Sequence, residues 1–259
     1  MFGNITILAT AVLMGMGTLT YLAFVQPHPH DKEAYQKIIR SSVAERPTNS
    51  LTQKPTYQHR TNIQKDLWLQ DRHVRITSPK SRLCVQQLND KFEITEHLES
   101  LECCLQETLT PETQEIRWLS AKEGVFEYPT TRLQAKEPHL SLYSLEGTEF
   151  PESIPQEPPN SSVQANSALW EWPNALRFAG NVRLFSNRIQ EKKTFALADE
   201  LFLYPSSGKV ELLADRSKKV LLWQDEMQLS SPSIEIQRDA KNKTDQIKGI
   251  GDVHFYFTG

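Results

Sequence analysis

Carboxylates on predicted strands are the residues here whose type and spacing could do chemistry, since hydrolysis of a glycosidic bond needs two carboxyl groups about 5–10 Å apart. Glu200, Glu211 and Glu235 lie in runs of alternating apolar residues. Charged side chains that alternate with apolar ones form the solvated face of a sheet. The sequence also contains no nucleophile elbow and no Gly-rich phosphate loop. We therefore predict no catalytic residues and no enzymatic activity.

Histidine and cysteine residues do not form a recognisable metal motif. His28 and His30 have no third ligand close by in the sequence. Cys103 and Cys104 would point to opposite faces of a strand, so at most one of them could pair with Cys84. Buried free thiols are the alternative to such a disulfide. We expect no metal and no cofactor.

The composition describes one large or two small domains. The chain has 259 residues, 38% of them hydrophobic and 24% charged, with a net charge of -3, which is enough to bury a core. Its 15 prolines and mean hydropathy of -0.51 indicate a soluble, turn-rich body. Lysines and arginines are scattered without a basic stripe, so we expect no nucleic-acid partner.

One segment near the N-terminus is strongly apolar. Ile5 to Val25 is an uncharged run of 21 residues, which as a helix would cross a hydrocarbon core of roughly 30 Å. It exceeds the ~7–15 apolar residues of a signal peptide and lacks a clean cleavage site, so we predict an uncleaved transmembrane anchor, with a cleaved signal as the alternative. Lys32, Lys37 and Arg40, which follow it, favour a cytoplasmic C-terminal side.

From Asp66 onward, apolar residues occur at alternating positions, a pattern typical of half-buried antiparallel strands. Val74/Ile76 and Leu83/Val85 are examples, whereas Glu96–Thr108 also fits a short helix. From Phe178 onward, short runs rich in branched and aromatic residues alternate with turns. We predict an all-β body with these divisions: anchor 1–26, stalk 27–60, first β-rich half 61–147, Pro- and Ser-rich loop 148–170, second β-rich half 171–259.

The two β-rich halves echo each other. Glu123–Thr131 aligns without gaps on Asp199–Ser207, and each is a strand that ends in tyrosine before a proline turn. A glycine, an Asn or Asp and a valine occur in order at Gly180 and again at Gly251. Repeated strand–turn–strand units stack to bury a shared face. The echo therefore favours a long, open β body over a compact enzyme.

Several short motifs share the order and spacing of a known repeat: Gly180-Asn181-Val182, Ala198-Asp199 followed by Tyr204, Ser207-Gly208, Val210-Glu211-Leu212 and Gly251-Asp252-Val253. They resemble the OstA-type repeat of the lipopolysaccharide-transport family, which includes LptA and LptC. The resemblance is best over Phe178–Phe257, fainter over Asp66–Leu145 and absent from Glu146–Ala168. A single anchor before a β body is closer to membrane-anchored LptC than to LptA, whose signal is cleaved.

The resemblance implies an open β-jellyroll whose two antiparallel sheets form a V-shaped trough for lipid A acyl chains. It implies a periplasmic body, anchored once in the inner membrane, that passes lipopolysaccharide along a bridge of Lpt proteins, with energy from an inner-membrane ABC transporter. Alternating strands would supply the apolar wall, although a sealed core would show the same alternation. The lipid-lining candidates are Val182, Leu184, Leu201, Leu203, Val210, Leu212, Val220, Leu222, Ile234 and Ile236.

The last predicted strand, Val253–Phe257, carries neither the lysine nor the proline that usually blunts an exposed sheet edge. We expect this edge to pair with the next protein of the bridge by strand addition, with coverage by a loop of the chain itself as the alternative. A membrane-anchored assembly scaffold in the envelope, without lipid cargo, is the alternative function. The partner-edge candidates are Val253, His254, Phe255, Tyr256 and Phe257.

Overall fold

The computed structural model describes residues 55–257 except 70–71, 89–90, 111, 129, 148, 172–174, 206 and 239–244. Apart from the last residues of β1, the strands below belong to one compact unit, residues 52–67 and 71–259. The described residues form antiparallel strands and one short 3₁₀ turn, Ile189–Glu191, with no α-helix among them. The prediction of an all-β body is therefore confirmed for this part of the chain.

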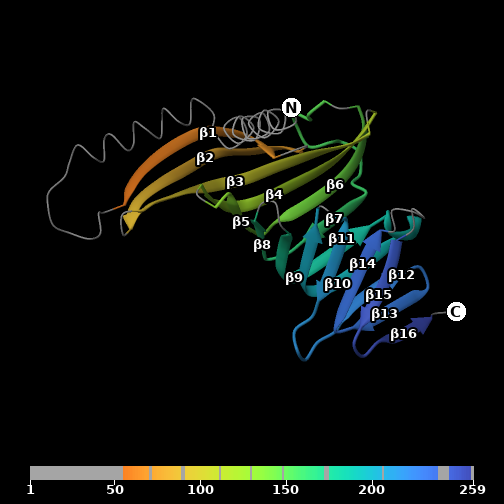
Figure 1. Ribbon diagram of the computed structural model, residues 1–259. Coiled ribbons are helices and arrows are strands. Elements are labelled where there is room, and N and C mark those ends of the chain that lie inside the picture. The colour runs from red at the N-terminus through yellow and green to blue at the C-terminus, as the bar shows by residue number, and fades with distance from the viewer. Residues whose placement is uncertain are drawn as a thin grey trace, which may run out of the picture. The chain divides into compact units, whose positions relative to one another are not determined.

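The strands follow the chain in order from β1 to β16 (Figure 1). Their bounds are β1 Thr56–Leu69, β2 Arg72–Leu88, β3 Lys91–Thr110, β4 Thr113–Glu127, β5 Arg132–Lys136, β6 His139–Glu146, β7 Ser161–Gln164, β8 Ser167–Glu171, β9 Leu176–Ser186, β10 Thr194–Tyr204, β11 Lys209–Leu213, β12 Val220–Gln224, β13 Met227–Ser231, β14 Ser233–Arg238, β15 Asp245–Ile250 and β16 His254–Phe257.

Several predicted segments can be compared with these bounds. The window Glu96–Thr108, for which a short helix was the alternative, lies within strand β3. Strands β7 and β8 occupy the end of the range 148–170, where the sequence predicted only a loop. Both strands have only four or five residues and follow a Pro- and Ser-rich stretch, so their alternation is a weak signal in the sequence. They join the two β-rich halves into one sheet.

The predicted anchor, with His28 and His30 beyond it, lies outside the described residues, as does the predicted stalk up to residue 54. β1 begins at Thr56, inside the range predicted as stalk. A search of the described residues finds no helix long and apolar enough to cross a membrane.

The sheet divides after β4 into two branches that share their long strands. The second half of β4 pairs with β5 and its first half with β6. Strands β9 and β10 are shared in the same way between neighbours in the two branches. The first branch runs β4-β5-β8-β9-β10-β11-β14-β15, and the second runs β4-β6-β7-β9-β10-β12-β13-β16. From β4 onward, the chain therefore crosses from one branch to the other on every pass.

Residues with a left-handed backbone mark some of these crossings. On β9, Gly180 (φ 80°) and Asn181 (φ 50°) together face Asp199 of β10, and this extra residue is a β-bulge. Gly251 (φ 94°) occupies the corresponding place between β15 and β16. Both copies of the repeated Gly-Asn/Asp-Val motif thus bend the chain from one branch into the other.

Each branch has one face that is buried along most of its strands, which we call its inner face. Across the first branch, the residues in register on this face form the first inner row: Leu83, Glu96, Phe126, Leu133, Trp170, Leu176, Leu203, Val210, Ile236 and Ile247. The second inner row crosses the second branch: Ile76, Cys103, Leu119, Leu140, Val163, Leu184, Ala196, Leu222, Leu229 and Phe255. Glu96 is the one charged member of the two rows.

The two inner faces meet at the bends. A Cβ on Gly124, in the first-branch half of β4, would lie 2.6 Å from Cδ2 of Leu101, which is on the second-branch half of β3. A Cβ on Gly249 of β15 would lie 3.0 Å from both methyl carbons of Val253, just before β16. Glycine at these positions leaves room for a side chain from the other branch, so the inner faces close on each other where the chain bends.

The Pro-rich loop after β6 packs on part of the opposite, outer face of the second branch. Phe150 lies against a buried cluster on this face and under the guanidinium of Arg75, whose Cζ is 4.4 Å from the ring centroid. The cluster consists of Cys104, Ile116, Trp118 and Tyr143. The loop therefore supplies a cover for this end of the outer face.

Candidate functional site

The ten lipid-lining candidates all lie on the inner faces. Leu203, Val210 and Ile236 belong to the first inner row, and Leu184 and Leu222 to the second. Leu201, Leu212 and Ile234 form a neighbouring row of the first branch, whereas Val182 and Val220 lie near the bend of the second. All of them are buried except Val210, which is half-buried. They are therefore packed side chains of one apolar interior.

This interior reaches an open edge at the C-terminal end. Among the described strands, β16 pairs only with β13, and β15 pairs only with β14. Phe255 and Phe257 lie opposite Leu229 and Met227 on the inner side, yet they are 57% and 74% exposed. Because the row to which Phe255 belongs is otherwise apolar and buried, its apolar surface continues to an edge that no described strand covers.

The other partner-edge candidates divide between the two sides of β16. Tyr256 and His254 lie opposite Gln228 and Ser230, on the outer side, and both are exposed. Val253 precedes the strand and packs over the position of Gly249. The edge thus offers aromatic side chains on both of its sides.

A buried ion pair interrupts the first inner row. Glu96 is 0% exposed, and its carboxylate lies 2.8 Å from Nζ of Lys65, which is itself buried. Ser81 Oγ and Tyr128 Oη donate to the two oxygens of Glu96 at 2.5 and 2.6 Å. The Lys65 ammonium also lies 4.2 Å from the ring centroid of Tyr128. Lysine, serine and tyrosine thus compensate this carboxylate within an apolar face.

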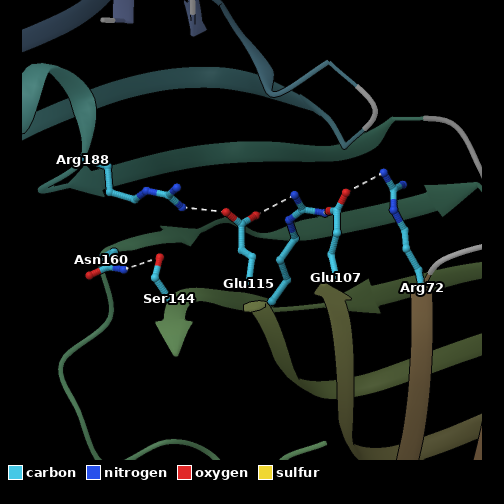
Figure 2. A network of polar contacts seen from close by, with 7 residues as sticks. Arg72, Glu107, Glu115, Ser144, Asn160 and Arg188 are labelled. Atoms are coloured by element: carbon cyan, nitrogen blue, oxygen red, sulfur yellow. Dashed lines mark hydrogen bonds and ion pairs between the residues drawn. The ribbon is translucent and has the colours of Figure 1, made fainter. Parts of the chain in front are cut away.

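A second polar group lies at the end of the second inner face away from the bends, and we call it the arginine ladder: Arg72, Glu107, Glu115, Arg117 and Arg188 (Figure 2). Glu107 and Glu115 face each other across β3 and β4. Like charges in this position repel, but Arg117 lies between them, with nitrogens 3.1 Å from Glu107 and 2.6 Å from Glu115.

The two ends of the ladder are arginines. Arg72 Nη2 lies 2.9 Å from Glu107 Oε1, and Arg188 Nη1 lies 2.6 Å from Glu115 Oε2. The ladder thus joins three guanidinium groups to two carboxylates. Burial alone would raise the pKa of Glu115, but Arg117 and Arg188 hold it below its ordinary value. Glu115 is therefore ionised at neutral pH.

The second inner face becomes more polar from the bends toward the ladder. The row that lies between the second inner row and the Glu107–Glu115 pair contains Arg117 of the ladder and two hydrogen-bonded pairs. Ser161 and Ser186 are joined at 2.7 Å, and Gln224 donates to Thr194 at 3.0 Å. The inner face of the second branch is thus apolar near the bends and charged at its rim, where the ladder lies.

The three cysteines are free thiols, so of the two alternatives left by the sequence the structure has free thiols and no disulfide. Cys103 lies on the inner face and Cys104 in the outer cluster, as their adjacent positions on a strand predicted. Cys103 pairs with Ile76 of β2, eight positions from Cys84, a separation of roughly 26 Å along a strand. Burial raises the pKa of Cys104 to about 12, so this thiol stays protonated at neutral pH.

The described residues contain no group of three or more His, Cys, Asp or Glu side chains placed to hold a metal ion. A shallow pocket of about 420 Å³ lies on the second branch beside the exposed Phe185 and Phe195. Glu200, Glu211 and Glu235 lie on the outer face of the first branch, where Glu200 pairs with Arg177 and the other two contact Lys209. These carboxylates form the solvated face that their alternation predicted.

Acid should weaken the fold partly through Glu115. Because its pKa is depressed in the folded protein, the stability it contributes is present above the ordinary value of 4.5 and is lost as pH falls below that value. We expect the free energy of unfolding to decline between pH about 5 and about 3, and to decline less steeply in Glu115→Gln. Urea unfolding across this range measures both slopes. Equal slopes would contradict the assignment to Glu115.

The described residues define the class of protein only as all-β, with bent antiparallel strands around an apolar interior. No protein-family model matches the chain, and no curated protein matches it. The resemblance to the OstA-type repeat therefore remains a prediction that rests on short motifs.

Proposed function

We propose that the protein binds lipopolysaccharide, with its acyl chains between the two inner faces, and passes it along a periplasmic bridge of the Lpt type. In this proposal the two branches are the sheets of an open, V-shaped β-jellyroll on a single-pass inner-membrane anchor. An inner-membrane ABC transporter supplies the energy. The body lies in the periplasm, although Lys32, Lys37 and Arg40 favour the opposite side.

One observation carries the proposal: the second inner row runs from β2 across the second branch to the exposed Phe255, beside which Phe257 is also exposed. A closed core would end in buried side chains. An amphiphile with long acyl chains needs an extended apolar surface with an exit, and the second inner row is long enough to offer it. The same edge could receive a strand from the next bridge protein.

A second function is favoured by a different observation. All but one of the ten lipid-lining candidates are buried against their neighbours, so acyl chains could enter only after the inner faces separate. An envelope assembly scaffold without lipid cargo would need no such opening. The two functions differ in whether the interior binds an amphiphile.

Displacement of a fluorescent apolar probe, N-phenylnaphthylamine, from the purified full chain tests the proposal. We expect lipopolysaccharide to displace the probe from the native protein. Val210→Asp, at a half-buried position on the inner face, should weaken this binding by about tenfold or more, because it places a charge against acyl chains. Leu221→Asp is the matched control, since Leu221 is half-buried on the outer side of β12. Absence of displacement by lipopolysaccharide would favour the scaffold.

A further inference from the structure

The arginine ladder joins strand ends, and it also places guanidinium groups at the rim of an apolar interior. The side chain of Arg117 is only 7% exposed. Its Nε is buried and finds no hydrogen-bond acceptor among the described residues. A buried donor of this kind costs free energy until an acceptor reaches it.

Arg188 gives the ladder an accessible end. Its side chain is 28% exposed, and the contact described for its guanidinium is made by Nη1 to Glu115. Arg188 follows β9, and its guanidinium contacts Glu115 of β4 (Figure 2). Strands β6 and β7 lie between β4 and β9 in the second branch, so Arg188 makes this contact at the end of the inner face that carries the ladder. Asn160 and Ser144, joined at 3.0 Å, lie beside it and add neutral donors and acceptors.

We propose that the arginine ladder binds the oxyanion headgroup of an amphiphile whose acyl chain occupies the interior, a proposal that rests on the function proposed above. The planar guanidinium fork fits phosphate and carboxylate oxygens, and hydrogen bonds between ionised groups are the strongest available to a headgroup. The geometry places apolar rows and a rim that carries guanidinium groups on one continuous face. An anionic amphiphile likewise has an apolar chain at one end and a negatively charged headgroup at the other, so it can contact both parts of this face.

Three amphiphiles with the same twelve-carbon chain length and different headgroups distinguish the contribution of the headgroup to affinity from that of the chain: dodecyl phosphate, dodecanoate and dodecyl maltoside. Each is titrated against the N-phenylnaphthylamine complex of the full chain. We expect dodecyl phosphate to bind about tenfold more tightly than dodecyl maltoside, and Arg188→Gln to remove this preference while leaving the affinity for maltoside within about twofold. Arg188→Lys should retain part of the preference. Dodecanoate tells whether any oxyanion suffices or phosphate is required.

Arg177→Gln is the matched control, because Arg177 also pairs with one glutamate but lies exposed on the outer side of the first branch. A preference for phosphate that survives Arg188→Gln, or that Arg177→Gln removes equally, would overturn the assignment to the ladder. Binding of all three amphiphiles with equal affinity would overturn it while leaving the proposed function intact. Failure of all three to displace the probe would contradict both.

Discussion

Glu96→Ala should lower the free energy of unfolding by about 3–5 kcal/mol, which is a large fraction of the stability of an ordinary domain. The substitution leaves the Lys65 ammonium, only 5% exposed, without its carboxylate in an apolar interior. It also removes the acceptor of Ser81 and of Tyr128. Equilibrium unfolding of the full chain in urea measures the loss.

Two further variants show whether burial of the charge is the cause. Replacing both partners, Lys65→Met with Glu96→Leu, should return the stability to within about 1 kcal/mol of the native protein or above it, because the buried ammonium is removed together with the carboxylate. Arg60, which lies 4.0 Å from Glu96, loses this contact too, but its side chain reaches solvent. Glu123→Ala breaks an exposed pair with Lys136 and should cost less than about 1 kcal/mol. A loss in Glu96→Ala no greater than that in Glu123→Ala would contradict the account of a buried, compensated pair.

Phe255→Asp should abolish association with the next bridge protein while the chain stays folded. Phe255 is 57% exposed on β16, so an aspartate there costs little in the isolated chain, but it places a charge on the surface that the incoming strand would cover. Co-purification of Lpt proteins with the tagged full chain measures the association. We expect at least a tenfold reduction.

Ile154→Asp is the matched control for the edge. Ile154 is 51% exposed in the loop between β6 and β7, so the two variants change side chains of similar character and exposure. It should leave co-purification unchanged. Equal recovery of Lpt proteins with both variants would remove β16 from the proposed interface.

The strands were predictable because each apolar residue alternates with a polar one over several positions. Alternation could not locate the bends, at which the buried side of β2, β3, β4 and β10 shifts by one residue. The echo between Glu123–Thr131 and Asp199–Ser207 illustrates this point. Its gapless alignment matches Phe126 with Phe202, yet Phe126 is buried on the inner face, whereas Phe202 lies opposite Glu211 on the outer face. The echo marks equivalent segments, but a one-residue shift exchanges their faces.

The arginine ladder was missed for a related reason. Charged residues that alternate on a strand were assigned to the solvated face, which is correct for Glu211 and Glu235. The spacing of Arg72 from the apolar Val74 and Ile76 places it on the inner side, and this parity was a usable signal. No such signal exists for Arg188, because the sheet order alone brings it to Glu115.

The proposed transport function depends on whether an acyl chain enters between the inner faces. Photo-crosslinking in cells tests this most directly, with a benzophenone amino acid placed at Leu184 or Leu212 on the inner faces and at Phe195 on the outer face. The proposal predicts adducts with lipopolysaccharide at the two inner positions and none at Phe195. Absence of adducts at both inner positions, or equal labelling at Phe195, would contradict it.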